Sequence, residues 1–152
     1  MKNTDDLTYH ERVLPSITSL LPLLLVTPTA YLTLLPFSAE TGLVVGLSVT
    51  IAILASIWFA SPVIELDSTG FAVGEALLPL GVISEAVAIP ADQRFEERGV
   101  KLSPAAYVRF QISVKTHIKI FIADEADPTP YWLVATRDPD CAVEVLKKLK
   151  QR

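Results

Sequence analysis

Two long stretches of this chain carry no charged side chain, and they stand close together near its N-terminus. They cover residues 13–39 and 41–64, with a single glutamate between them. A helix rises about 1.5 Å per residue, so about 20 apolar residues cross the hydrocarbon core of a bilayer. Lipid offers no partner for exposed backbone groups, which makes helices necessary. The pattern therefore predicts a membrane hairpin within residues 13–64, with spans at about 14–36 and 42–62.

Proline and glycine residues mark the two predicted spans. Pro22 and Pro28 lie inside the first span and predict kinks, because proline removes a backbone donor. Gly42 and Gly46 have the G-x-x-x-G spacing that allows close approach of another helix. That helix is either the first span or a second copy of the chain, so a homo-oligomer through these glycines is one prediction. Ionisable residues inside a span are the usual mark of a transport pathway, and neither span contains an acidic residue, a lysine, an arginine or a histidine. A small oligomeric pore lined by the proline-bearing helices is an alternative to a simple anchor.

The basic residues around the spans favour one orientation. Lys2 and Arg12 precede the first span, whereas the connection LPFSAETG contains neither lysine nor arginine. Short flanks rich in these residues stay in the cytoplasm. Residues 1–12 are therefore predicted to be a cytoplasmic leader, and both termini to lie on the cytoplasmic side of the inner cell membrane. A signal peptide fits poorly, since this leader is acidic on balance and the apolar stretch exceeds a normal signal core.

Residues 63–152 have an ordinary density of charge and are long enough for one small core. The segments VIEL and FAVGE flank the turn DSTG, which predicts a compact hairpin. VISEAVAI, residues 82–89, predicts another strand. The polar segment PADQRFEERGVKLSP, residues 90–104, has proline and glycine at its edges and middle, and it predicts an exposed, mobile loop.

Apolar residues, with Thr116 as the exception, occupy every second place from Val108 to Ile122. This alternation predicts a half-buried strand with one wet face. One long strand is the simplest account, and two strands joined without a tight turn are the alternative. The predicted wet face carries a row of basic and ionisable residues: Arg109, Lys115, His117 and Lys119.

The stretch DPTPYWLVATRDP predicts a turn, a return strand and the start of a C-terminal helix. Asp138 is a good helix cap, and Pro139 suits the first helical position. Apolar residues at helical spacing follow, which indicates one buried helix face. The predicted fold class is thus a membrane hairpin joined to a small α+β domain, in which a mainly antiparallel sheet is closed by a C-terminal helix. Arg137 alone is left without a structural role.

No set of side chains in the sequence indicates catalysis, a metal site or a cofactor. The single cysteine, Cys141, has no evident histidine partner, and the motifs of zinc, calcium and phosphate sites do not occur. A net charge of −4 gives no indication of nucleic-acid binding. A membrane-bound enzyme remains the alternative. It would need Arg137 with the Asp124–Asp127 turn, or the charged loop Arg94–Arg98, to converge on one pocket.

Three segments carry a resemblance to a known family: Tyr9-His10-Glu11-Arg12 before the first span, SPVIELDSTGFAVGEALLPLGVI after the second, and DPTPYWLVATR near the end. Over nearly its whole length the chain resembles a family of two-helix actinobacterial membrane proteins of unknown function, and this resemblance brings no catalytic residues. The order of spans, strand-turn-strand and a Leu-Pro-Leu-x-x-Ile element is also similar to bacterial pleckstrin-homology-like membrane proteins. That similarity implies a bent antiparallel sheet with a C-terminal helix for residues 63–152.

Together these features predict a membrane-anchored interaction module that is not an enzyme. Its ligand would be anionic lipid headgroups or a membrane or cytoplasmic protein, and each base near the bilayer surface would contribute about 1 kcal/mol of attraction. The candidate contact residues are Arg109, Lys115, His117, Lys119 and Arg137.

Overall fold

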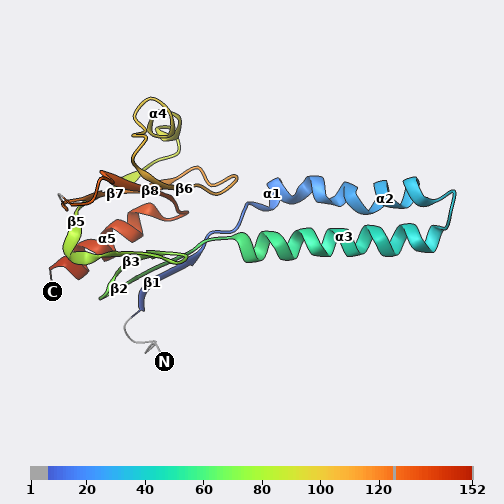
Figure 1. Ribbon diagram of the computed structural model, residues 1–152, viewed down its shortest axis with the longest axis horizontal. Coiled ribbons are helices and arrows are strands. Elements are labelled where there is room, and N and C mark those ends of the chain that lie inside the picture. The colour runs from blue at the N-terminus through green and yellow to red at the C-terminus, as the bar shows by residue number, and fades with distance from the viewer. Residues whose placement is uncertain (1–6, 125, 152) are drawn as a thin grey trace. The chain divides into compact units, whose positions relative to one another are not determined.

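The computed structural model describes residues 7–124 and 126–151, and the chain divides into two compact units. One unit is Leu14–Ser61. The other joins the residues before Leu14 to Pro62–Arg152 (Figure 1). The first six residues of the predicted leader lie outside the described residues. The second unit is therefore built from both sides of the apolar region, and not only from the part that follows it.

The unit Leu14–Ser61 consists of two apolar helical stretches. The first contains the helix α1 (Ile17–Leu20), the 3₁₀ turn η2 (Leu21–Leu25) and the helix α2 (Val26–Leu34); the second is the continuous helix α3 (Ala39–Ala60). Pro22 lies in η2, so the predicted break in the helix occurs where a backbone donor is missing. Both stretches are long and apolar enough to cross a membrane, and almost none of their residues is buried within the chain.

The two glycines of α3 face α2. A Cβ atom on Gly46 would lie 2.9 Å from Cα of Thr27, and one on Gly42 would lie 3.0 Å from Cα of Tyr31. The hydroxyl groups of Thr27 and Thr50 also lie 3.0 Å apart. Of the two predicted partners for the G-x-x-x-G spacing, the structure thus shows the first span. A contact with a second copy through the same glycines stays a prediction.

The first sheet of the globular unit contains four antiparallel strands in sequence order: β1 (Leu7–Arg12), β2 (Val63–Asp67), β3 (Gly70–Val73) and β4 (Ala76–Pro79). The predicted β2–β3 hairpin is confirmed. Its turn is held by the Asp67 carboxylate, which accepts hydrogen bonds from the backbone of Thr69 and Gly70. The predicted leader also contains a strand, which its sequence does not indicate: β1 pairs with β2 along its length.

The second sheet has the order β5-β7-β8-β6 and contains β5 (Ile83–Ile89), β7 (His117–Ile122), β8 (Tyr131–Ala135) and β6 (Tyr107–Arg109). The strand β6 runs parallel to β8, and the other pairs are antiparallel. A single long strand over residues 108–122 is therefore wrong, and the alternative of two strands is the one observed. Residues 110–116 connect them, and Ser113 adopts a left-handed conformation with φ of 68°.

The C-terminal helix α5 (Pro139–Lys150) packs between the two sheets (Figure 1). The Asp138 carboxylate accepts a hydrogen bond from the Cys141 amide, as the predicted cap requires. Residues from both sheets and α5 form one hydrophobic core, in which the largest fully buried side chains include Phe71, Ile120 and Leu146. This confirms a mainly antiparallel β domain with a C-terminal helix.

Candidate functional site

The five predicted contact residues do not form one surface row. Arg109 and Lys115 are exposed on either side of the β6–β7 connection, and Arg137 is exposed after β8. His117 is fully buried, and Lys119 is largely buried in an ion pair. The prediction of a common wet face is wrong because β6 and β7 are separate strands. In addition, the segment between β5 and β6 packs over β7, where its Glu97 pairs with Lys119.

The β6–β7 connection is attached to the residue that leads into the apolar unit. Gln111 Nε2 donates a hydrogen bond of 2.8 Å to the carbonyl oxygen of Val13, and the Val13 amide donates one of 2.9 Å to Pro62. Val13 and Pro62 are the residues on either side of Leu14–Ser61. Next to Gln111, the side chain of Ile112 is 76% exposed. An exposed apolar side chain, flanked by Arg109 and Lys115, is thus held where the chain enters and leaves the apolar unit.

The segment between β5 and β6 packs on the second sheet through a short helix and specific side-chain contacts. It contains the short helix α4 (Arg94–Arg98), and the buried Glu97 of this helix forms an ion pair of 2.7 Å with Lys119 on β7. Lys101 Nζ lies 3.6 Å from the same carboxyl group. Most residues of the segment are exposed, as predicted, but the buried Glu97 forms a charge pair that fastens it to the sheet.

Tyr131 provides a second attachment for this segment. Its hydroxyl group accepts a hydrogen bond from the Ser103 amide at 2.7 Å and donates one to the Lys101 carbonyl oxygen at 3.0 Å. Beneath it, Leu102 and Ala106 pack on Ile89, Tyr131 and Leu133. The two residues that begin β8 therefore have different roles. Tyr131 attaches the segment between β5 and β6, whereas Trp132 packs in the main core.

His117 is a buried neutral side chain, which corrects its predicted exposure. Its ring lies edge-on to Phe110, with centroids 5.6 Å apart, and neither ring nitrogen has a hydrogen-bond partner among the described residues. Burial, with the nearby charges of Arg98 and Arg94, lowers the pKa of His117 to about 4. The backbone of Lys115 acts in the opposite direction on this pKa, although no hydrogen bond of good geometry joins the two residues. A side chain in this position cannot contact a lipid headgroup.

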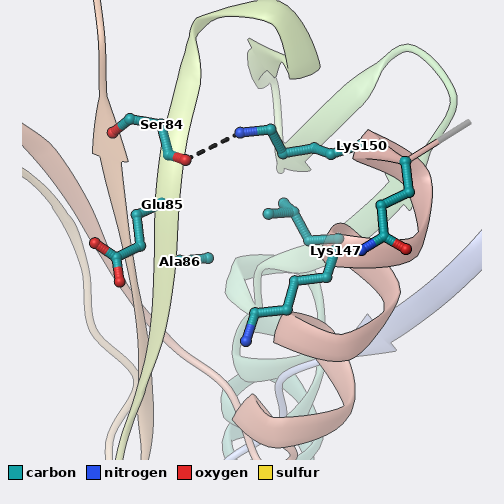
Figure 2. Close-up of a pocket in the computed structure, with 7 residues that line it drawn as sticks. Ser84, Glu85, Ala86, Lys147 and Lys150 are labelled. Carbon is teal, nitrogen blue, oxygen red and sulfur yellow. Dashed lines mark hydrogen bonds between the residues drawn. The ribbon is translucent and has the colours of Figure 1, made fainter.

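A hollow of about 210 Å³ lies between β5 and the C-terminal end of α5 (Figure 2). Lys150 Nζ crosses it and donates hydrogen bonds to the carbonyl oxygens of Ile83 and Ser84 at 2.6 and 3.0 Å. Lys147 extends from the same helix, whereas the Glu85 carboxylate points away from α5 (Figure 2). Because β5 is an edge strand, Lys150 satisfies open carbonyl groups and hinders pairing with a foreign strand.

Two of the three resemblance segments meet at the end of β8. The Glu11 carboxylate accepts hydrogen bonds from the hydroxyl of Tyr9 at 2.8 Å, the hydroxyl of Thr136 at 2.5 Å and the amide of Arg137 at 3.1 Å. Thr136 is fully buried, and burial raises the pKa of Tyr9, an effect that the Thr136 hydroxyl opposes and the Glu11 charge reinforces. Since donors surround the carboxylate, its evident role is to fix β1 to the β8–α5 junction. Arg137 takes part through its backbone.

Replacing Thr136 by valine is expected to lower the free energy of unfolding by about 1–3 kcal/mol, because the partly buried Glu11 carboxylate loses a donor with little change in side-chain volume. Denaturant unfolding of the full chain in detergent micelles, followed through the near-ultraviolet signal of Trp132, measures this change. The matched control is Thr136→Ser, which keeps the hydroxyl group and should lose much less. Equal stability of the valine variant and the unchanged protein would contradict a bonding role for Thr136.

The acids of the enzyme hypothesis bond to neighbouring backbone amides. Asp124 and Asp127 accept hydrogen bonds from the amides of Ala126 and Thr129, two residues further on in each case. The hollow beside α4 is lined by Arg94, Phe95, Arg98 and Gly99, and none of these is an acid. Within residues 7–124 and 126–151, no group of three or more histidine, cysteine or acidic residues is arranged to hold a metal ion.

Comparison with known proteins gives one match. The model of a family described as "Protein of unknown function (DUF3093)" matches residues 8–146, which include both apolar helical stretches and most of the globular unit. No curated protein and no solved structure matches the chain. The matched range begins just before Tyr9 and ends in α5, so it contains the segments that meet around Glu11. The chain belongs to the DUF3093 family of proteins of unknown function.

Proposed function

We propose that this chain is an integral membrane protein whose helical hairpin anchors a headgroup-binding domain at the inner membrane face. The observation that supports this most strongly is the exposure of the apolar helices. Ile17 and Phe59 are more than four-fifths exposed, and many leucine and valine side chains of these helices are exposed to a lesser extent. Apolar surface of this extent is unfavourable in water and favourable in lipid.

The pairing of β1 with β2 supports a two-pass arrangement. These strands are neighbours in one sheet, and they immediately precede and follow the apolar unit. Both ends of the hairpin must therefore emerge on the same side of the bilayer, where the sheet forms. The basic residues before the first span favour the cytoplasmic side. We further propose a pleckstrin-homology-like origin for the domain, because two antiparallel-rich sheets enclose one C-terminal helix.

The β6–β7 connection is the proposed headgroup contact. Its tie to Val13 keeps it at the entry to the hairpin, and its exposed Ile112 is suited to the boundary between headgroups and acyl chains. Arg109 and Lys115 add charge, and each base close to an anionic surface contributes about 1 kcal/mol. Of the five predicted contact residues, these two fit the proposal best.

Hydrogen exchange of the full chain in lipid nanodiscs tests this function. Amides of residues 110–116 are expected to exchange several-fold more slowly in nanodiscs of anionic lipid than in those of neutral lipid. The double variant Arg109→Gln with Lys115→Gln should remove most of this difference, because it removes both charges. Lys148→Gln is the control, since Lys148 is an exposed base on α5 that pairs with Glu144.

Two results would count against the proposal. Extraction of the chain from membranes by alkaline carbonate would contradict integral insertion. Identical exchange of residues 110–116 in neutral and anionic nanodiscs would contradict headgroup binding by this connection, even if insertion is confirmed.

A further inference from the structure

The segment that covers the second sheet presents two exposed apolar side chains beside two arginines. Phe95 is 75% exposed and Val100 is 94% exposed. We call the four residues Arg94, Phe95, Arg98 and Val100 the α4 surface. The segment is fastened by the Glu97–Lys119 pair and by Tyr131, and Phe95 and Val100 contribute nothing to either attachment. Large apolar side chains held outward on an ordered scaffold indicate a binding surface.

The charges around the α4 surface leave its arginines available. Glu96 and Glu97, the acids of the helix, lie 3.1 and 3.6 Å from Lys101, and Glu97 also pairs with Lys119. Among the described residues, neither arginine of the α4 surface forms an ion pair. Asp92 is the one other acid in the segment, and it precedes the helix. The α4 surface therefore carries two positive charges that the fold itself does not use for pairing.

Aromatic rings hold the two guanidinium groups in place. Arg94 lies over the ring of Phe95, with its Cζ atom 4.3 Å from the centroid, and Arg98 lies over Phe110 at 4.0 Å. Both arginines line one hollow of about 390 Å³ together with Phe95 and Gly99. Planar guanidinium groups donate several hydrogen bonds in a fixed geometry that suits phosphate oxygens. The hollow is therefore suited to a phosphate group.

The α4 surface is continuous with the proposed headgroup contact. Arg98 covers Phe110, the first residue of the β6–β7 connection, and the next residue, Gln111, is bonded to Val13. A phosphate bound to a small soluble molecule would leave Phe95 and Val100 exposed to water. A phospholipid bilayer satisfies both the arginines, through its phosphates, and these apolar side chains, through its acyl boundary.

We infer that the α4 surface docks on an anionic phospholipid bilayer, with phosphate oxygens between Arg94 and Arg98 and with Phe95 and Val100 entering the acyl boundary. This inference rests on the proposed function, because the hairpin brings the domain to the membrane. It adds a second contact, formed by residues that the sequence placed in a mobile loop, and it names phosphodiester lipid as the ligand.

A fluorescent label on the α4 surface tests the inference in the full chain. The label is attached to Val100→Cys in a Cys141→Ser background, and the protein is reconstituted in vesicles of phosphatidylcholine with or without phosphatidylglycerol. Emission at position 100 is expected to shift to the blue, and to be quenched by nitroxide lipids, only in the vesicles that contain phosphatidylglycerol. Adding Arg94→Gln and Arg98→Gln should weaken the contact by on the order of tenfold or more. Arg94→Gln alone provides the same test if the double variant does not fold.

The controls separate the possible sources of a signal. A label at Glu75→Cys, on the exposed β3–β4 turn, should be unaffected by lipid composition. Equal access of water-soluble iodide to position 100 in both kinds of vesicle would overturn the inference while leaving the hairpin anchor intact. An equal shift with inorganic phosphate in detergent, without lipid, would also overturn it, because the ligand would then be free phosphate. Failure of the hairpin anchor would instead be seen as release of the whole chain by alkaline carbonate.

Discussion

Replacing Lys119 by methionine is expected to lower the free energy of unfolding by about 3 kcal/mol. The change removes the main partner of Glu97, whose side chain is only 8% exposed, and leaves a buried carboxylate with the weaker contact from Lys101 at 3.6 Å. The loss should be concentrated in the cover of the second sheet. Trypsin cleavage after Arg94 and Arg98 is expected to accelerate, and denaturant unfolding in micelles measures the total effect.

An exposed ion pair in the same chain provides the matched control. Lys148 and Glu144 are also 2.7 Å apart, but each side chain is 68% exposed. Exposed pairs contribute about 0–1 kcal/mol, so Lys148→Met should have little effect on stability or on cleavage. The double variant Lys119→Met with Glu97→Gln should recover part of the loss, because the buried charge is gone. Equal effects of Lys119→Met and Lys148→Met would show that burial of the pair does not matter.

Acidification from pH 6.5 to about pH 4 is expected to lower the free energy of unfolding by on the order of 2–3 kcal/mol through His117 alone. An unfolded histidine binds a proton near pH 6.5, whereas burial and the charges of Arg98 and Arg94 hold the pKa of folded His117 at about 4. Between these values the unfolded state binds more protons. Stability therefore falls as the pH falls, and below about pH 4 this contribution changes no further.

Unfolding of the full chain at a series of pH values checks this effect. His117→Leu removes the titrating group while keeping an apolar side chain, and it should flatten the curve between pH 6.5 and 4. His10→Gln is the control, because His10 is about half exposed, with a side-chain exposure of 47%. An unchanged slope in His117→Leu would assign the acid sensitivity to other groups. Hydrogen exchange at low pH should show the segment 90–106 opening first, since it covers His117.

The parts of the fold that local sequence determines were predicted correctly. The turn between β2 and β3 depends on Asp67, Thr69 and Gly70, which are adjacent in the chain. The start of α5 depends on Asp138 and Pro139, and the capping bond spans three residues. The two apolar helical stretches follow from composition alone. In each case the residues that decide the structure are neighbours, so their pattern is visible in one short window.

Contacts between distant segments explain the errors. The strand β1 forms because β2 lies beside it, more than 50 residues later, and nothing in the sequence of the leader requires a strand. The alternation of polar and apolar residues continues without interruption from 108 to 122. It therefore does not indicate that the strand ends before Ser113, where the backbone is left-handed. His117 and Glu97 were expected to be exposed to solvent. Both are buried, because the segment that contains Glu97 folds across the strand that contains His117.

The candidate site was predicted in part for the same reason. Arg109 and Lys115 are exposed bases, as expected, but their relation to the apolar unit depends on the hydrogen bond from Gln111 to Val13, which joins residues 98 positions apart. The α4 surface was missed because its arginines are balanced by acids in the sequence. Only the structure shows that those acids pair with Lys101 and Lys119, which leaves the arginines as the remaining charge.

The position of the hairpin between β1 and β2 has a consequence for biosynthesis. A ribosome completes Leu7–Arg12 first, but the partner of this strand, Val63–Asp67, is made only after both apolar stretches. The first sheet cannot close until both apolar stretches have been synthesised, so the domain completes its fold only after the hairpin has been made. During this interval β1 is an unpaired strand edge, and such edges are prone to wrong pairing. The short length of β1 and its charged end, Glu11-Arg12, reduce the risk of wrong pairing until β2 has been synthesised.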